Sequence, residues 1–65
     1  MSIGENIKKR REKLGISQIE LGEAACVSGG LISQIEADIK FPSLPIAFRI
    51  ADKLNCKVDD FKDKT

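Results

Sequence analysis

Apolar residues recur along much of the chain at spacings of three and four positions, the period of an α-helix that packs on one face. Between residues 17 and 36 this pattern stops and restarts within a few positions. It therefore predicts two short helices, over about 18–25 and 29–37, joined by a tight turn. The apolar positions that form their inward faces are Leu21, Ala24, Ala25, Ile32 and Ile35.

Polar residues mark where these two helices begin. Ser17 and Glu20 have the S-x-x-E spacing of a capping box, in which each side chain caps the backbone N–H of the other residue. Ser28 is a favourable N-cap for the second helix. Two helices this short cannot each bury a face alone, so they must cross over a shared core, which is the helix-turn-helix arrangement. In that arrangement the second helix lies in the major groove of DNA.

The rest of the sequence is also typical of helices. Ser2 and Glu5 repeat the capping-box spacing, so a first helix should run from near Ile3 to Gly15, a residue suited to a helix end. No segment alternates with period two, so the fold class is all-α.

A proline separates the predicted 29–37 helix from a further one. Pro42 disfavours helix at the residue before it, and Ser43 then caps a fourth helix. Asn55 can adopt the left-handed conformation that ends this helix, and residues 58–61 resemble a short closing turn. The inward positions expected in the first and fourth helices are Ile3, Ile7, Leu14, Leu44, Ala47, Phe48, Ala51 and Leu54.

Length and charge set limits on function. The 65 residues fit one domain, residues 1–65, near the lower limit for folding on a hydrophobic core alone. The formal net charge is only +1, so tight binding to DNA would need two copies. Basic residues cluster between positions 8 and 13. This cluster could attract nucleic acid, and a solvated helix face is an equal alternative. No apolar run is long enough to cross a membrane and no signal peptide is present, so we expect a cytoplasmic protein.

The chain offers little for catalysis or metal binding. Cys26 and Cys56 without any histidine are too few ligands for a zinc site, and we expect both thiols to be reduced. A redox switch at Cys26 is a minor alternative. No nucleophile stands beside a base, and Gly29 and Gly30 lack the preceding strand and spaced lysine of a phosphate loop. The sequence predicts no enzymatic activity, cofactor, metal or small-molecule ligand.

The outward side of the predicted 29–37 helix is small and uncharged. A helix that enters a DNA groove can have such a face, because close approach matters more than charge. Taken alone, the face favours an ordinary solvent-exposed surface, because two glycines at a helix start cost roughly 1 kcal/mol each relative to alanine. The residues that helical geometry directs outward are Gly30, Ser33, Gln34 and Ala37, with Gly29 at the margin.

With these elements in place, the chain resembles the phage-repressor (Cro/C1, XRE-type) helix-turn-helix family. The resemblance implies a compact five-helix lambda-repressor-like domain that binds operator DNA as a homodimer and represses transcription. For a dimer the sequence itself adds only that Ile46 and Ile50 lie one turn apart beside the inward face. The matching residues are Arg11, Gly15, Ser17, Gln18, Leu21, Ala25, Val27, Ser28, Ile32, Ser33, Ile35, Glu36, Pro42, Ser43, Leu44, Ile50, Ala51 and Leu54.

The resemblance also implies a set of DNA-binding residues. Gln18 and Lys40 would contact phosphates from the start of the 18–25 helix and from the loop after the 29–37 helix. The groove-facing positions would be Ser28, Gly29, Gly30, Ser33 and Gln34. Arg11 and Glu36 each lie at the edge of the expected core, where a charge is tolerated only when paired, so we expect an ion pair between them.

Several positions depart from the family pattern. Gly22 stands for the usual alanine, Cys26 for the turn glycine, and Asp38 for the glycine that ends the 29–37 helix, where it would add negative charge near DNA. Gly29 and Gly30 remove two base-reading side chains. Direct readout would then rest on Gln34, with Ser33 and Leu31. The paired glycines and Asp38 also support an alternative, a helix-turn-helix adaptor that binds protein instead of DNA.

Overall fold

The structure is a computed structural model that describes residues 2–61. Its elements are α1 (Ile3–Lys13), α2 (Gln18–Ala25), α3 (Gly29–Glu36), α4 (Leu44–Lys53) and a closing 3-10 turn, η1 (Val58–Phe61). Their bounds lie within two residues of those predicted, and no strand occurs in residues 2–61. The all-α fold is therefore confirmed.

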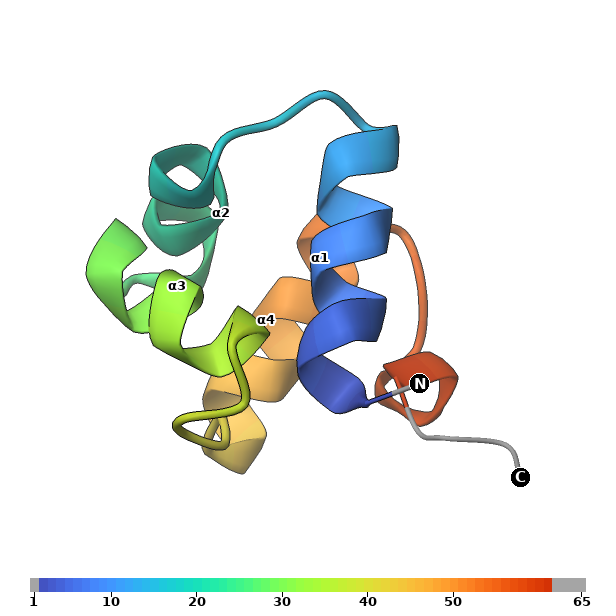
Figure 1. Cartoon of the computed structure of the whole chain (residues 1–65). Coiled ribbons are helices and arrows are strands. Elements are labelled where there is room, and N and C mark those ends of the chain that lie inside the picture. Colours follow the sequence, from blue (N-terminus) through green and yellow to red (C-terminus); the bar gives the residue numbers. More distant parts are fainter. Residues whose placement is uncertain (1, 62–65) are drawn as a thin grey trace.

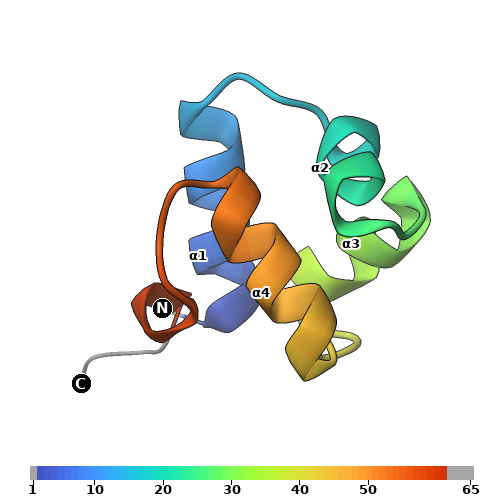
Figure 2. The same cartoon turned by 180° about the vertical axis from the view of Figure 1, so that it is seen from behind.

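The helices pack around one core with α2 and α3 on one side of the molecule (Figure 1). Helix α1 lies on the opposite side, and α4, which is behind in Figure 1, crosses in front in the reverse view (Figure 2). Each element contributes to the core, and Asn6 Nδ2 donates to the Phe61 carbonyl at 3.2 Å, which fixes η1 against α1. The largest fully buried side chains are Ile7, Leu21, Ile32, Ile35, Ile50 and Phe61.

A serine precedes and caps each α-helix, as predicted. The four hydroxyl oxygens accept the N–H of the third helical residue at 3.0–3.4 Å. At α2 the capping box is complete, because the Glu20 carboxylate also accepts the Ser17 N–H at 3.2 Å. The capping serines are Ser2, Ser17, Ser28 and Ser43.

Some residues predicted to face inward are exposed. Leu14 and Leu44 lie at helix ends, where the packing partners stop. Ala24 is exposed because α2 turns Gly22 into its buried face instead. Phe48 lies on the flank of α4, because the buried stripe of that helix centres on Ile50, which was expected beside the core. Ile50 is fully buried and therefore unavailable to a partner chain.

Two glycines mark the closest crossings between elements. A Cβ on Gly22 would lie 2.7 Å from the Val27 carbonyl oxygen, so the α2–α3 turn passes directly over this residue. A Cβ on Gly4 would lie 2.6 Å from the Glu36 carbonyl oxygen, where α1 crosses the end of α3. No larger residue fits either position without moving the backbone.

Candidate nucleic-acid interface

The turn between α2 and α3 depends on a left-handed residue. Cys26, which stands where the family has the turn glycine, adopts φ 61° and ψ 37°, and the Val27 N–H then donates to the Gly22 carbonyl at 2.8 Å. Ser28 follows and starts α3. Residues 26–28 therefore reverse the chain and set α3 across α2.

Helix α3 presents a small outer face to solvent. Ile32, Ile35 and Glu36 are buried, which orients the opposite side of the helix outward. Because the first N–H groups of a helix have no partner within it, α3 also offers backbone donors at its N-terminus. Among the predicted groove-facing residues Ser28, Gly30 and Ser33 are exposed, and Gly29 and Gln34 are half-buried.

The two glycines at the start of α3 have different surroundings. A Cβ on Gly30 would meet only the Ser28 hydroxyl at 3.7 Å, so this position is open. A Cβ on Gly29 would lie 3.0 Å from Cγ1 of Ile19, so that position is partly covered by α2. Ile19 was not among the predicted site residues. The sequence did hold a signal for it, because Ile19 is an aliphatic residue that lies off the inward face of α2.

The expected ion pair between Arg11 and Glu36 is present and largely buried. Arg11 Nε donates to Glu36 Oε2 at 2.7 Å, and Nη2 donates to Oε1 at 3.1 Å. The side chains are only 11% and 3% exposed. The hydrogen bond that Arg11 donates to Glu36 raises the pKa of Arg11 against the opposing effect of burial, so the guanidinium keeps its charge.

This ion pair connects three helices. Arg11 Nη1 donates to the Ile16 carbonyl at 2.9 Å, and Gln18 Nε2 donates to Glu36 Oε1 at 3.1 Å. One network therefore joins α1, the α1–α2 loop, the start of α2 and the end of α3. It holds α3 at a fixed angle to α2, and it engages one of the two amide protons of Gln18.

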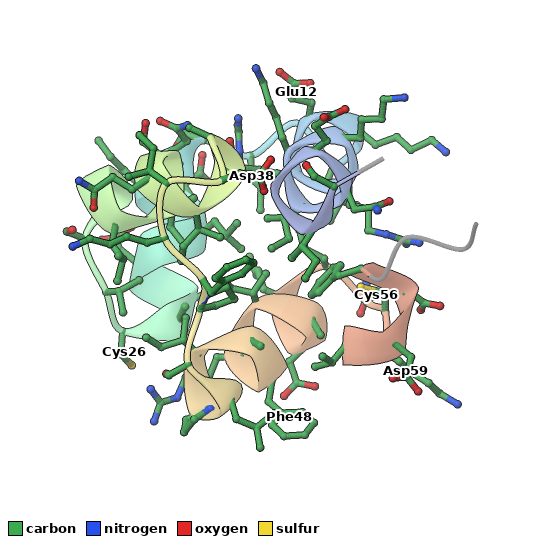
Figure 3. All side chains as sticks on the ribbon, turned by 60° about the horizontal axis from the view of Figure 1, so that its bottom comes forward. Glu12, Cys26, Asp38, Phe48, Cys56 and Asp59 are labelled. Atoms are coloured by element: carbon green, nitrogen blue, oxygen red, sulfur yellow. The ribbon has the colours of Figure 1, made fainter. Side chains whose placement is uncertain are left out.

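Asp38 points away from the outer face of α3. It adopts φ 61°, and its Oδ1 accepts the Gly4 N–H at 3.1 Å, at the N-terminus of α1 (Figure 3). A carboxylate there is favoured by the helix dipole. The carboxylate expected to add negative charge near DNA is thus engaged at the start of α1. Lys40, in the following loop, is exposed.

Other candidate chemistry is sparse. Cys26 is exposed and Cys56 half-buried, and both are free thiols. Within residues 2–61, no three His, Cys, Asp or Glu side chains come together as a metal site would require. None of the helices described is long and apolar enough to span a bilayer.

Two short helices crossed through a tight turn, with the second presenting a small outer face, define a helix-turn-helix protein. Residues 7–61 match the helix-turn-helix family model, and the chain belongs to this family. No curated protein matches the sequence significantly.

Solved structures of a repressor and of a DNA-binding regulator resemble the chain over almost its full length. The P22 c2 repressor, in complex with synthetic operator 9T, shares 32% identity with a TM-score of 0.94, covering 100% of this chain and 98% of that one. The N-terminal DNA-binding domain of SinR from Bacillus subtilis shares 31% identity with a TM-score of 0.86, covering 95% and 93% of the two chains. SinR in complex with DNA shares 32% identity with a TM-score of 0.85, covering 94% and 98%.

Proposed function

We propose that the protein is a sequence-specific DNA-binding transcriptional regulator, a repressor, that places α3 in the major groove of operator DNA. The observation that carries this proposal is the outer face of α3, which is free of bulky and charged side chains and is held rigidly on α2. The similar P22 c2 and SinR structures in complex with DNA support it. Residues 1–65 would act as one such domain in the cytoplasm, without catalytic activity or cofactor.

The proposed contacts follow from chemistry and position. Gln34 carries a paired donor and acceptor and would read adenine, and Ser33 would assist. Gln18 retains one free amide proton for a phosphate, since Glu36 accepts only one. Lys40 would neutralise a second phosphate from its exposed loop. The backbone N–H groups at the start of α3 would add a third contact of this type.

We further propose that the protein binds as a homodimer. A chain of net charge +1 neutralises few phosphates, so two linked copies are needed for tight binding. Exposed large apolar side chains in the loop before α4 and along α4 support self-association. They are Phe41, Leu44 and Phe48.

The salt dependence of binding to duplex DNA tests the proposal. Affinity should fall as salt rises from 50 to 200 mM, because counterions are released when lysines neutralise phosphates. Lys40→Ala should make the slope shallower by about one for each half-site. Lys53→Ala, at the exposed end of α4, is the matched control and should leave the slope unchanged. Absent or salt-independent binding would instead favour an adaptor.

A further inference from the structure

Ile19 is an exposed aliphatic residue at the edge of the proposed DNA-binding face. It is the second residue of α2, and its side chain remains 67% exposed. The buried face of α2 consists of Leu21, Gly22 and Ala25, so Ile19 contributes nothing to the core. Single exposed apolar residues are ordinary on protein surfaces. The position of this one, against the first turn of α3, distinguishes it.

Ile19 and Gly29 fit each other. A Cβ on Gly29 would lie 3.0 Å from Ile19 Cγ1 and 3.2 Å from its Cα, closer than side chains normally pack. The isoleucine therefore occupies the space beside Gly29, and a residue with a side chain there would displace it. At this groove-facing position, the nearest side chain belongs to α2 instead of α3.

The glycines also let DNA approach more closely. Gly29 and Gly30 offer no side chains to hold the groove floor away from α3, and the space over Gly30 is open. A base edge facing the first turn of α3 would then meet the branched aliphatic side chain of Ile19. The major-groove feature that suits such a side chain is the C5 methyl group of thymine.

We propose that Ile19 is a specificity-determining residue that selects thymine at the base pair facing the first turn of α3. This inference rests on the proposed function. It assigns base discrimination to α2 at the place where α3 has none, and it is independent of the role given to Gln34.

A methyl-deletion cycle tests the inference on the operator selected from random duplex DNA. Each thymine of a half-site is replaced in turn by deoxyuridine, which removes only the methyl group, and Kd is measured for the wild type and for Ile19→Ala. The wild type should lose about three- to five-fold in affinity at one position, the effect of one buried methyl group. Ile19→Ala should bind the thymine and deoxyuridine duplexes equally at that position.

Two controls keep the result specific. Leu14→Ala removes a comparable exposed aliphatic side chain, 49% exposed at the far end of α1, and should retain the wild-type sensitivity to deoxyuridine. Ile19→Val, which retains a branched side chain, should retain part of it. Thermal unfolding of all three variants should match the wild type, because neither residue is buried.

Three outcomes overturn the inference. If Ile19→Ala keeps the wild-type response at every thymine, Ile19 does not read a methyl group, although the protein still binds DNA. If the wild type is insensitive to deoxyuridine throughout, the operator has no methyl contact and the inference fails likewise. If the wild type binds no duplex at all, the proposed function fails and this inference fails with it.

Discussion

At the scale of single residues, the Arg11–Glu36 pair is the most consequential contact of the molecule. It is almost excluded from solvent and accepts a further hydrogen bond from Gln18. A buried pair of this kind does not by itself raise stability, because both charges lose their hydration. Its role here is geometric, since it fixes α1 and α2 against the end of α3.

Removing one member of this pair should be more harmful than removing both. Glu36→Ala leaves the Arg11 guanidinium buried without a partner, so the free energy of unfolding should fall by about 3–5 kcal/mol. Urea denaturation of Arg11→Leu, Glu36→Ala and the double variant forms a double-mutant cycle. Additive losses would show that the two side chains do not interact.

The two glutamines should differ in how they affect DNA binding. Gln34→Ala should cost about 1–3 kcal/mol at one base pair of each half-site, because a bidentate base contact is lost. Gln18→Ala should weaken binding to all sequences alike, since a phosphate contact does not specify sequence. Kd values for the operator and a scrambled duplex separate these effects.

The structure adds a requirement to this comparison. Because Gln18 also donates to Glu36, Gln18→Ala should lower the free energy of unfolding by about 1 kcal/mol, and binding is best measured well below the melting temperature. If Gln34→Ala leaves the ratio of the two affinities intact, this residue does not read bases.

At the scale of helices, local sequence signals predicted most of the fold. Ser17 with Glu20 and the left-handed residues at Cys26 and Asn55 act on backbone groups only a few positions away. A capping hydroxyl or a left-handed residue has the same effect in any surroundings. The starts and ends of the helices could therefore be predicted from the sequence alone.

Contacts between distant segments could not be predicted in the same way. The carboxylate of Asp38 accepts the N–H of Gly4, and Ile19 covers Gly29, only because the helices cross at particular angles. The exposed flank of α4 at Phe48 has the same origin, since neighbouring helices decide which face is buried. The Arg11–Glu36 contact was predictable because both charges lie at the edge of the expected core, whereas the contacts of Asp38 and Ile19 had no such signal.

The left-handed turn at Cys26 gives a prediction for this scale. A residue with a Cβ is strained there by about 1 kcal/mol, and the exposed thiol makes little packing contact. Cys26→Gly should leave the melting temperature unchanged or raise it slightly, while Cys26→Ala should not raise it. A clear loss of stability in Cys26→Gly would mean that the cysteine side chain packs in the turn.

At the scale of the whole molecule, the charge is too small for one copy to bind DNA tightly. Of the basic cluster on α1, Arg11 is engaged by Glu36 and cannot serve phosphates. The lysines of the cluster, Lys8, Lys9 and Lys13, are exposed, which is consistent with a solvated helix face. Affinity should then depend on dimerisation and on the close fit of α3 in the groove.

Disrupting the exposed apolar side chains near α4 should separate folding from assembly. The Phe48 side chain is 56% exposed in the single chain, so Phe48→Glu should leave the monomer folded. Sedimentation should show a shift from dimer to monomer, with weaker operator binding. If the variant still sediments as a dimer, the dimer contact lies elsewhere on the protein.

Selection of binding sites from random duplex DNA tests the central claim most directly, because it examines DNA binding, symmetry and base preference together. We predict enrichment of a palindrome whose half-sites lie about 10 base pairs apart, one turn of DNA, as expected for two copies of α3 in successive major grooves. Enrichment of a single unpaired half-site would contradict the homodimer. No enrichment over the starting pool would contradict sequence-specific recognition of DNA by α3.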